Sequence, residues 1–138
     1  MRYKELIYQG KTYTETYQID DILSKHKFLW VLDAEIENAR IEILKDTLIW
    51  NSGIWYNGTW KYGVHRNGEW RFGVWENGVW FNGVFWNGIF KSGLVYNGTF
   101  YKGQFISGEA KKMMPKGEYA TKHNFIDCEI SPNFKIEK

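Results

Sequence analysis

Glycine recurs at every fifth position through the middle of this 138-residue chain without a gap. The twelve glycines are Gly53, Gly58, Gly63, Gly68, Gly73, Gly78, Gly83, Gly88, Gly93, Gly98, Gly103 and Gly108. Two residues after nearly every glycine comes a large side chain, in the column Trp50, Trp55, Trp60, His65, Trp70, Trp75, Trp80, Phe85, Phe90, Val95, Phe100 and Phe105. A strict period restricts the chain to an architecture built from one small repeated unit.

A related five-residue pattern begins before the first glycine. Ala34-Glu35-Ile36-Glu37-Asn38 and Ala39-Arg40-Ile41-Glu42-Ile43 place a small residue first and an aliphatic residue third, as the later units place Gly first and Trp or Phe third. The phase slips by one residue across Leu44-Lys45-Asp46-Thr47, which we interpret as a distorted corner. We therefore predict one array over residues 29–112, with three units before the slip and thirteen after it, sixteen in all.

The segment that precedes the array, residues 1–28, differs from it in sequence pattern. Tyr3–Tyr8 and Thr12–Tyr17 flank a predicted hairpin turn at Gln9-Gly10-Lys11. Acidic residues precede basic ones over Asp20–Phe28, as a short helix prefers. We expect this hairpin and helix to cap one end of the array, because terminal units expose core surface.

The last part of the chain loses the rhythm after Lys112. Met113–Gly117 is a predicted loop because it holds both Pro and Gly, and a strand-like stretch follows at residues 124–136. That stretch is either a last, imperfect edge of the array or a strand that folds back. The predicted parts are an N-terminal cap (1–28), the array (29–112) and a C-terminal loop and strand cap (113–138).

Two architectures repeat every five residues. A meander of hairpins is suggested by pairs such as Asn57-Gly58, because Asn-Gly is the strongest short-range hairpin signal. Strand parity argues against it, because residues two apart, such as Thr59 and Lys61, direct their backbone groups to the same side and cannot pair with both neighbouring strands. The meander is possible only if two types of turn alternate along the chain. A weaker ten-residue period in the sequence is compatible with such alternation. That period places Asn at positions 57, 67, 77, 87 and 97.

A solenoid has no such conflict, because each coil pairs in parallel with the coils before and after it. We predict coils of four five-residue sides, so that residues 20 apart stack and the ten-residue period marks opposite corners. The first and third residues of each unit should point inward, and the Asn before each glycine should tolerate the positive backbone angles of a corner. The predicted fold class is all-β, a β-solenoid of about four coils with a short hairpin and helix cap. A single-layer β-meander is the alternative.

The two alanine-containing units resemble those of the pentapeptide-repeat proteins, which fold as right-handed quadrilateral β-helices. The resemblance extends by phase over residues 29–112, with Gly and Trp where that family uses Ala and Leu or Phe. The unit Gly58-Thr59-Trp60-Lys61-Tyr62-Gly63 is also similar to the core of the MORN repeat, which builds single-layer hairpin sheets. Gly-Trp-Asn arrays of this style are also similar to repeats in virion and tail-associated proteins of tailed bacteriophages.

The residues capable of catalysis are scattered. His26, His65 and His123 lie in different contexts without a second ligand at metal spacing, and His65 occupies the aromatic column, so a core histidine is the preferred interpretation. Cys128 lies between two acidic residues, which disfavour a thiolate nucleophile. The glycines lack the Lys-Ser/Thr of a phosphate loop. We expect no enzyme, no catalytic residue, no metal site and no cofactor.

The outward positions supply the candidate interaction surface. On a 20-residue spacing, Lys61, Phe81 and Tyr101 align, and so do Arg66 with Trp86, Tyr56 with Tyr96, and Arg71 with Lys91. Aromatic residues interleaved with bases on one wall are suited to stacking sugars or anchoring a protein, whereas packing between coils is the structural explanation. The candidate residues are Tyr56, Lys61, Arg66, Arg71, Phe81, Trp86, Lys91, Tyr96 and Tyr101.

These observations favour a non-enzymatic structural or docking protein, and the phage resemblance points to a virion or tail-associated component. The first alternative is a carbohydrate-binding module that uses surface aromatic residues, namely Tyr56, Phe81, Trp86, Tyr96 and Tyr101. The second is an intracellular binder of a DNA-processing enzyme, as some pentapeptide-repeat proteins are, although such mimics are acidic and the net charge here is +2. Expected partners are proteins, in a larger assembly or as further copies of the chain, or a glycan.

No apolar signal-peptide core follows Met1, and no run of about 18 apolar residues exists. The single cysteine excludes an internal disulfide and fits a reducing compartment. We therefore expect cytoplasmic synthesis without a signal peptide, compatible with later release in a virion. Neither a membrane nor a specific nucleic acid is an expected partner.

Overall fold

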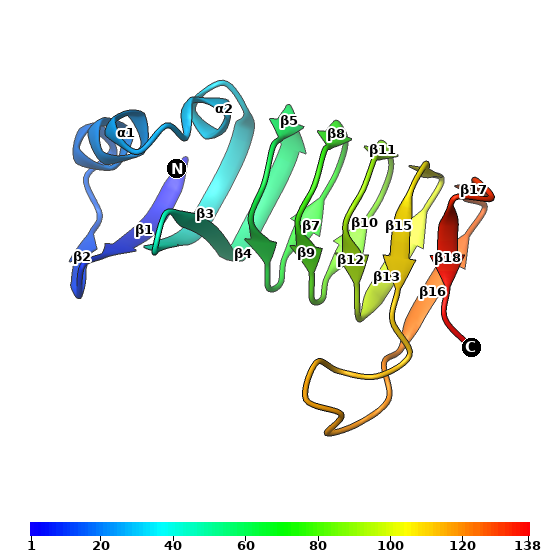
Figure 1. The fold of residues 1–138 in the computed structure, drawn as a ribbon. Helices are drawn as coiled ribbons and strands as arrows, with labels where there is room; N and C mark the ends of the chain where they lie inside the picture. Colours follow the sequence, from blue (N-terminus) through cyan, green and yellow to red (C-terminus); the bar gives the residue numbers. More distant parts are fainter.

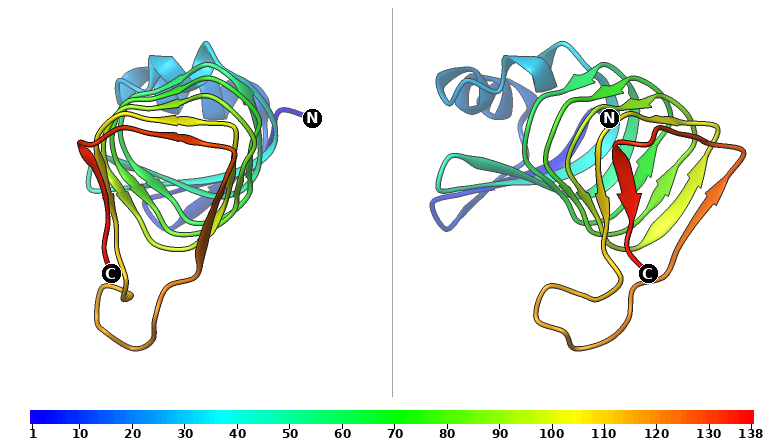
Figure 2. Two further views of the ribbon diagram at one scale, coloured as in Figure 1. Left: turned by 90° about the vertical axis from the view of Figure 1, so that its right-hand side faces the viewer. Right: turned by 45° about the vertical axis from the view of Figure 1, so that its right-hand side comes forward.

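Each glycine-containing unit forms one side of a coil, and three sides complete the coil. In the computed structural model, which describes all 138 residues of the chain, each unit pairs in parallel with the third unit after it. Trp55 pairs in this way with Trp70, and Trp60 with Trp75. A view along the solenoid shows the nearly triangular outline of the last coil (Figure 2). The predicted all-β solenoid is confirmed and the antiparallel meander is excluded. The predicted four-sided, 20-residue coil is wrong.

The coil has sides A, B and C. Side A contains the second half of β4 (Thr47–Asn57), β7 (Glu69–Trp70), β10 (Val84–Phe85), β13 (Gly98–Tyr101) and β16 (His123–Ile126). Side B contains β5 (Thr59–Trp60), β8 (Val74–Trp75), β11 (Ile89–Phe90), β14 (Gln104–Phe105) and β17 (Glu129–Ile130). Side C contains the first half of β4, then β6 (Val64–His65), β9 (Val79–Trp80), β12 (Leu94–Val95), β15 (Gly108–Ala110) and β18 (Phe134–Ile136).

The N-terminal end is covered by a hairpin and a helix, as the sequence predicts (Figure 1). The helix begins earlier than predicted, at Thr16, and the second strand of the hairpin is correspondingly shorter. The hairpin joins β1 (Tyr3–Tyr8) to β2 (Lys11–Tyr13), and α1 (Thr16–Lys25) and α2 (Leu29–Leu32) follow. β3 (Glu35–Leu44) then pairs in parallel with β1 and antiparallel with β4. Neither helix has the length and apolar character that crossing a membrane requires.

The predicted start of the coils at Leu29 is wrong. Leu29–Leu32 is helical, and the predicted corner at residues 44–47 is the turn of the β3–β4 hairpin, with Lys45 and Asp46 at positive φ. The apparent repeat in β3 has another cause. Asn38, at φ 53°, interrupts the strand register, so the buried side chains on its two sides are spaced irregularly.

The C-terminal stretch forms a further coil and does not fold back. β16, β17 and β18 pair in parallel with β13, β14 and β15. Partners across this junction, such as Phe100 and Phe125, are farther apart in sequence than partners in the earlier coils, such as Phe85 and Phe100. Compared with the earlier coils, this junction contains an insertion as long as two units, which forms a loop between β15 and β16. This loop hangs from one edge of the solenoid (Figure 1).

The third residue of each unit fills the core, as predicted. Side chains stack from coil to coil, with ring centroids 4.8 Å apart and planes 4° apart for Trp60 and Trp75. Within a coil the rings meet edge to face, at 70° for Trp70 and Trp75. The six buried tryptophans of these columns are at most 1% exposed. They are Trp50, Trp55, Trp60, Trp70, Trp75 and Trp80.

The glycines form the corners of the coil, where each packs against the coil before it. Gly68 has φ +119°, and a Cβ there would lie 2.6 Å from the carbonyl oxygen of Gly53 in the preceding coil. This contact leaves no room for any larger residue. The predicted positive angles of the array asparagines are also wrong, because the glycines adopt them. Several asparagines instead accept a hydrogen bond from the following glycine N–H, as Asn67 does from Gly68 at 2.9 Å.

Candidate docking surface

The fourth residues of the units on side A form a ladder of stacked side chains along the solenoid. We call this set, Tyr56, Arg71, Trp86 and Tyr101, the side A ladder. The Arg71 guanidinium carbon lies 6.0 Å from the Tyr56 ring centroid and 5.9 Å from that of Trp86. The Trp86 and Tyr101 rings stack at 4.8 Å with planes 13° apart. The ladder exists because successive members are separated by one coil length.

Carboxylates hold the ladder in place. The Tyr56 hydroxyl donates to Glu37 Oε2 at 3.1 Å, and Arg71 Nε donates to Glu69 Oε2 at 2.7 Å. The hydrogen bond to Glu37 raises the pKa of Tyr56. Trp86 remains 41% exposed and Tyr56 39% exposed, so the ladder lies on the surface. It is therefore an ordered, solvent-exposed row of aromatic and cationic groups.

The stacking determines which parts of the rings are available. One face of the Trp86 ring packs against the Arg71 guanidinium, and the other stacks on the Tyr101 ring. Ring edges and the guanidinium are therefore what a partner meets. A sugar-binding aromatic platform instead presents a free ring face, so this geometry suits contact with a protein better than stacking of a glycan.

The other predicted surface residues lie on different sides. Arg66, Phe81 and Tyr96 belong to side C, where the Phe81 and Tyr96 rings stack at 5.1 Å and Tyr96 is only 7% exposed. Lys61 and Lys91 belong to side B, and Lys61 pairs with Glu76 at 3.1 Å. The predicted 20-residue alignments, such as Arg66 with Trp86, are wrong because residues 20 apart lie on different sides of a three-sided coil.

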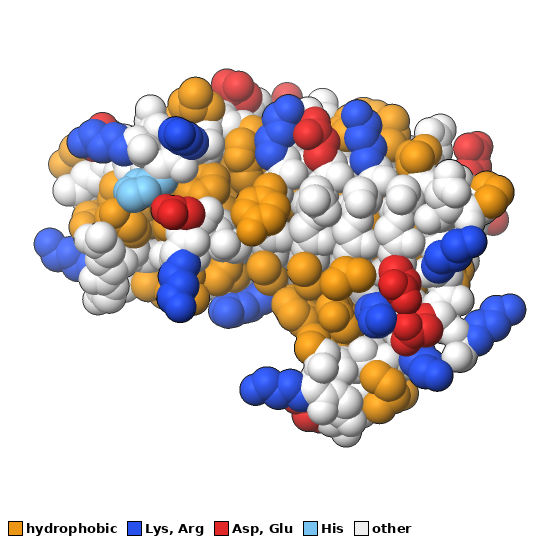
Figure 3. Space-filling view, viewed as in Figure 1, with side chains coloured by type: hydrophobic (Ala, Val, Ile, Leu, Met, Phe, Trp, Pro, Cys, Tyr) orange, Lys and Arg blue, Asp and Glu red, His pale blue; other side chains and the backbone are white.

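Side C meets the inserted loop. Asn97 donates from Nδ2 to the sulfur of Met114 at 3.4 Å, and its side-chain oxygen accepts from the Lys122 N–H at 2.7 Å. Hydrophobic side chains gather where the loop leaves the solenoid (Figure 3). Tyr96, the residue before Asn97, is buried and therefore unsuited to binding.

The predicted surface lacks two residues that the structure adds to it. Phe72, the residue after Arg71, is 52% exposed, and Glu37 from β3 anchors Tyr56. When the sequence is aligned with a period of one coil, Phe72 falls in a column with Asn57 and Asn87. An aromatic residue in this otherwise polar column is the signal that could have identified Phe72. Glu37 had no such signal, because the sequence does not show that β3 pairs with β4.

Two titratable groups with shifted pKa values lie in or beside the core. Burial lowers the pKa of His65 to about 3, and its Nδ1 lies 3.2 Å from the Asn82 carbonyl oxygen. Burial raises the pKa of Cys128, whose Sγ donates to the Phe100 carbonyl at 3.2 Å. No group of three His, Cys, Asp or Glu side chains is arranged to hold a metal ion. His65 is a core residue, as its place in the aromatic column indicated.

The comparisons with known proteins name no relative. The chain matches no protein-family model, no curated protein and no solved structure.

Proposed function

We propose that this protein is a non-enzymatic structural or docking protein that binds a protein partner through side A. The observation that carries the proposal is the side A ladder. Tyr, Trp and Arg are the residue types that most often dominate the energy of protein interfaces. Here they lie in a single ordered row on a flat side of the solenoid.

The scaffold suits this role because the ladder is held before binding. Arg71 N–H donates to the Trp55 carbonyl at 2.7 Å, and Trp86 N–H donates to the Trp70 carbonyl at 2.8 Å, so the two central ladder residues are bonded to the coil before them. Stacked core rings support these strands from the inside. A surface ordered in advance loses little conformational entropy on binding, which favours affinity.

Within this class, we assign the protein to phage-type virion or tail-associated components. The support is the resemblance of its Gly-Trp-Asn units to repeats in such proteins. The regular parallel pairing of each coil with the next supports a rigid scaffold role in the same way. If the protein is a virion component, an antibody against the chain should detect it in virus particles purified from its natural source. Its absence from such particles would refute the virion assignment but would not affect the proposed docking role.

The docking role is tested by replacing Trp86 with Ala in the tagged full chain. Trp86→Ala should reduce recovery of the specific partner by about tenfold or more, because hot-spot residues contribute about 2 kcal/mol or more. Ile106→Ala is the matched control, because Ile106 is 43% exposed but lies on side B. Circular dichroism checks that both variants fold. Equal recovery with Trp86→Ala and Ile106→Ala would refute the role of side A.

The same two variants separate protein docking from glycan binding. Loss of binding to an immobilised glycan in Trp86→Ala alone, with protein recovery unchanged, would favour the carbohydrate-binding alternative.

A further inference from the structure

The last coil leaves two of its inward-facing side chains partly uncovered. Ile130 and Ile136 occupy the inward positions of β17 and β18, yet they are 37% and 38% exposed. Their counterparts one coil earlier, Phe105 and Ala110, are fully buried at 0%. The apolar interior of the solenoid therefore meets solvent at this end.

The backbone is also unpaired here. The carbonyls of inward residues accept hydrogen bonds from the coil that follows, as Phe90 does from Ile106 at 2.9 Å and Phe105 from Ser131 at 2.9 Å. No strand pairs with the outer edges of β16, β17 and β18. Three strand edges, one from each side, thus surround the exposed interior. We call this surface the open end.

The opposite end is closed. Trp30 of α2 packs against Trp60 with ring centroids 5.2 Å apart at 65°, and β3 pairs with β4. The helices and hairpin cover that end of the solenoid (Figure 1). One molecule therefore cannot stack its N-terminal end on the open end of another.

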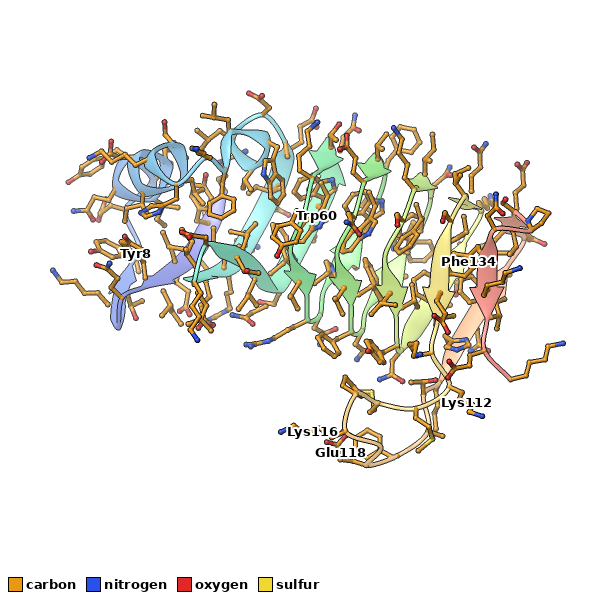
Figure 4. All side chains as sticks on the ribbon, in the orientation of Figure 1. Tyr8, Trp60, Lys112, Lys116, Glu118 and Phe134 are labelled. Atoms are coloured by element: carbon orange, nitrogen blue, oxygen red, sulfur yellow. The ribbon has the colours of Figure 1, made fainter.

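Nothing within the chain folds over the open end. The inserted loop with Lys116 and Glu118 hangs beside the solenoid, and Phe134 lies on the last coil (Figure 4). Glu137 is held at the side, because its carboxylate accepts from Lys111 Nζ at 2.9 Å and from the Lys112 N–H at 3.1 Å.

We propose that the open end binds the open end of a second copy of this chain. A single extended strand satisfies only one of the three edges, and it leaves the apolar interior exposed. A second open end presents three edges in the same triangular arrangement. It covers the interior at the same time. This proposal is independent of the docking role of side A.

Symmetry restricts how the two ends meet. A two-fold axis in the plane of the end reverses the direction of all three strands, so every pair across the interface is antiparallel. For the triangles to coincide, the axis passes through the middle of one side. The strand on that side then pairs with its own copy, and the other two strands pair with each other.

Charge selects one of the three possible axes. An axis through β17 brings two copies of Glu129 together, and an axis through β18 brings two copies of Lys135 together, with repulsion in both cases. An axis through β16 places Glu129 opposite Lys135 of the second copy, twice by symmetry. β16 itself, His123–Ile126, contains no acidic residue, lysine or arginine. The favoured dimer therefore has its axis at β16.

The first test is the mass in solution of the full chain. Light scattering after size exclusion should give twice the monomer mass of 16.4 kDa. Ile130→Asp should return the protein to the monomer, because it places a charge in the covered interior. Ile106→Asp, at a similarly exposed isoleucine on the same side one coil away, should remain dimeric. A monomeric wild type, or a dimer that survives Ile130→Asp, would overturn the proposal.

The second test is a charge exchange that identifies the axis. Glu129→Lys and Lys135→Glu should each weaken the dimer by about tenfold, because the like-charge contact occurs twice. The double variant should restore wild-type dimerisation. Single variants without effect, or a double variant no better than either, would overturn the axis at β16. Unchanged circular dichroism in each variant confirms that loss of the dimer is not loss of the fold.

Discussion

Acid should destabilise this protein through one histidine in its core. His65 lies in the side C column between Trp50 and Trp80, with its ring 3.9 Å from that of Trp80 and their planes 3° apart. It is 1% exposed, and Nε2 has no hydrogen-bond partner. A proton on Nε2 would place an unsolvated charge among aromatic rings. Burial therefore lowers the pKa of His65 to about 3.

The pKa difference sets the size and the sign of the effect. In the unfolded chain His65 titrates near its ordinary pKa of 6.5. Between pH 6.5 and about 3 the unfolded state binds this proton and the folded state does not, so stability falls as the pH falls. The loss approaches about 1.4 kcal/mol per pH unit, and it amounts to about 2.7 kcal/mol on going from pH 7.5 to 4.5. Well above pH 6.5 the contribution is constant.

Urea unfolding from pH 7.5 to 4.5 measures this loss, with His65→Phe as the control. Phe fills equivalent inward positions at Phe85 and Phe90, and it cannot bind a proton. Every other titratable group is common to both proteins, so the difference between the two profiles isolates His65. The wild type should lose about 2.7 kcal/mol more than the variant by pH 4.5. Parallel profiles would show that the His65 site is solvated and would refute the reasoning.

Two further predictions concern the corners and the core, and both are measured by urea unfolding at neutral pH. Gly68→Ala should cost about 3 kcal/mol, because its Cβ meets the Gly53 carbonyl at positive φ, whereas Gly117→Ala, at φ +69° with nothing within 4 Å, should cost about 1 kcal/mol. Equal costs would mean that the coils separate to admit a side chain. Trp75→Ala should cost about 3 to 5 kcal/mol, and Lys61→Ala well under about 1 kcal/mol, because Lys61 makes only a surface ion pair. Equally mild effects would contradict the inward position of Trp75.

The sequence was sufficient to predict which residues face inward but not how many sides close a coil. The aromatic column identifies the core, because large apolar side chains at a fixed spacing must share one environment. Five-residue sides are compatible with triangles and squares alike. The choice depends on backbone angles at the corners, such as φ +119° at Gly68, which no residue type alone reveals.

The sequence indicated outward positions for the candidate residues but not which of them lie together. All nine residues occupy outward positions of their units, yet a 20-residue coil assigned them to the wrong neighbours. The ladder of Tyr56, Arg71 and Trp86 becomes visible when the sequence is aligned with a period of three units. The ten-residue period of asparagines matches no repeat of the fold, because Asn57, Asn67 and Asn77 lie on sides A, C and B.

The triangular section follows from what the units place inside. With glycine at every corner, each side contributes one inward side chain, so a coil has three, as in Trp70, Trp75 and Trp80. Three indoles meeting edge to face, at 70° and 68°, fill such a section. Side C tapers to Val95 and Ala110 near the C-terminal end, and Phe134, 4% exposed, turns in to pack against Phe105 at 5.2 Å. The interior thus remains filled up to the last coil, and only the inward residues of that coil are left for a partner to cover.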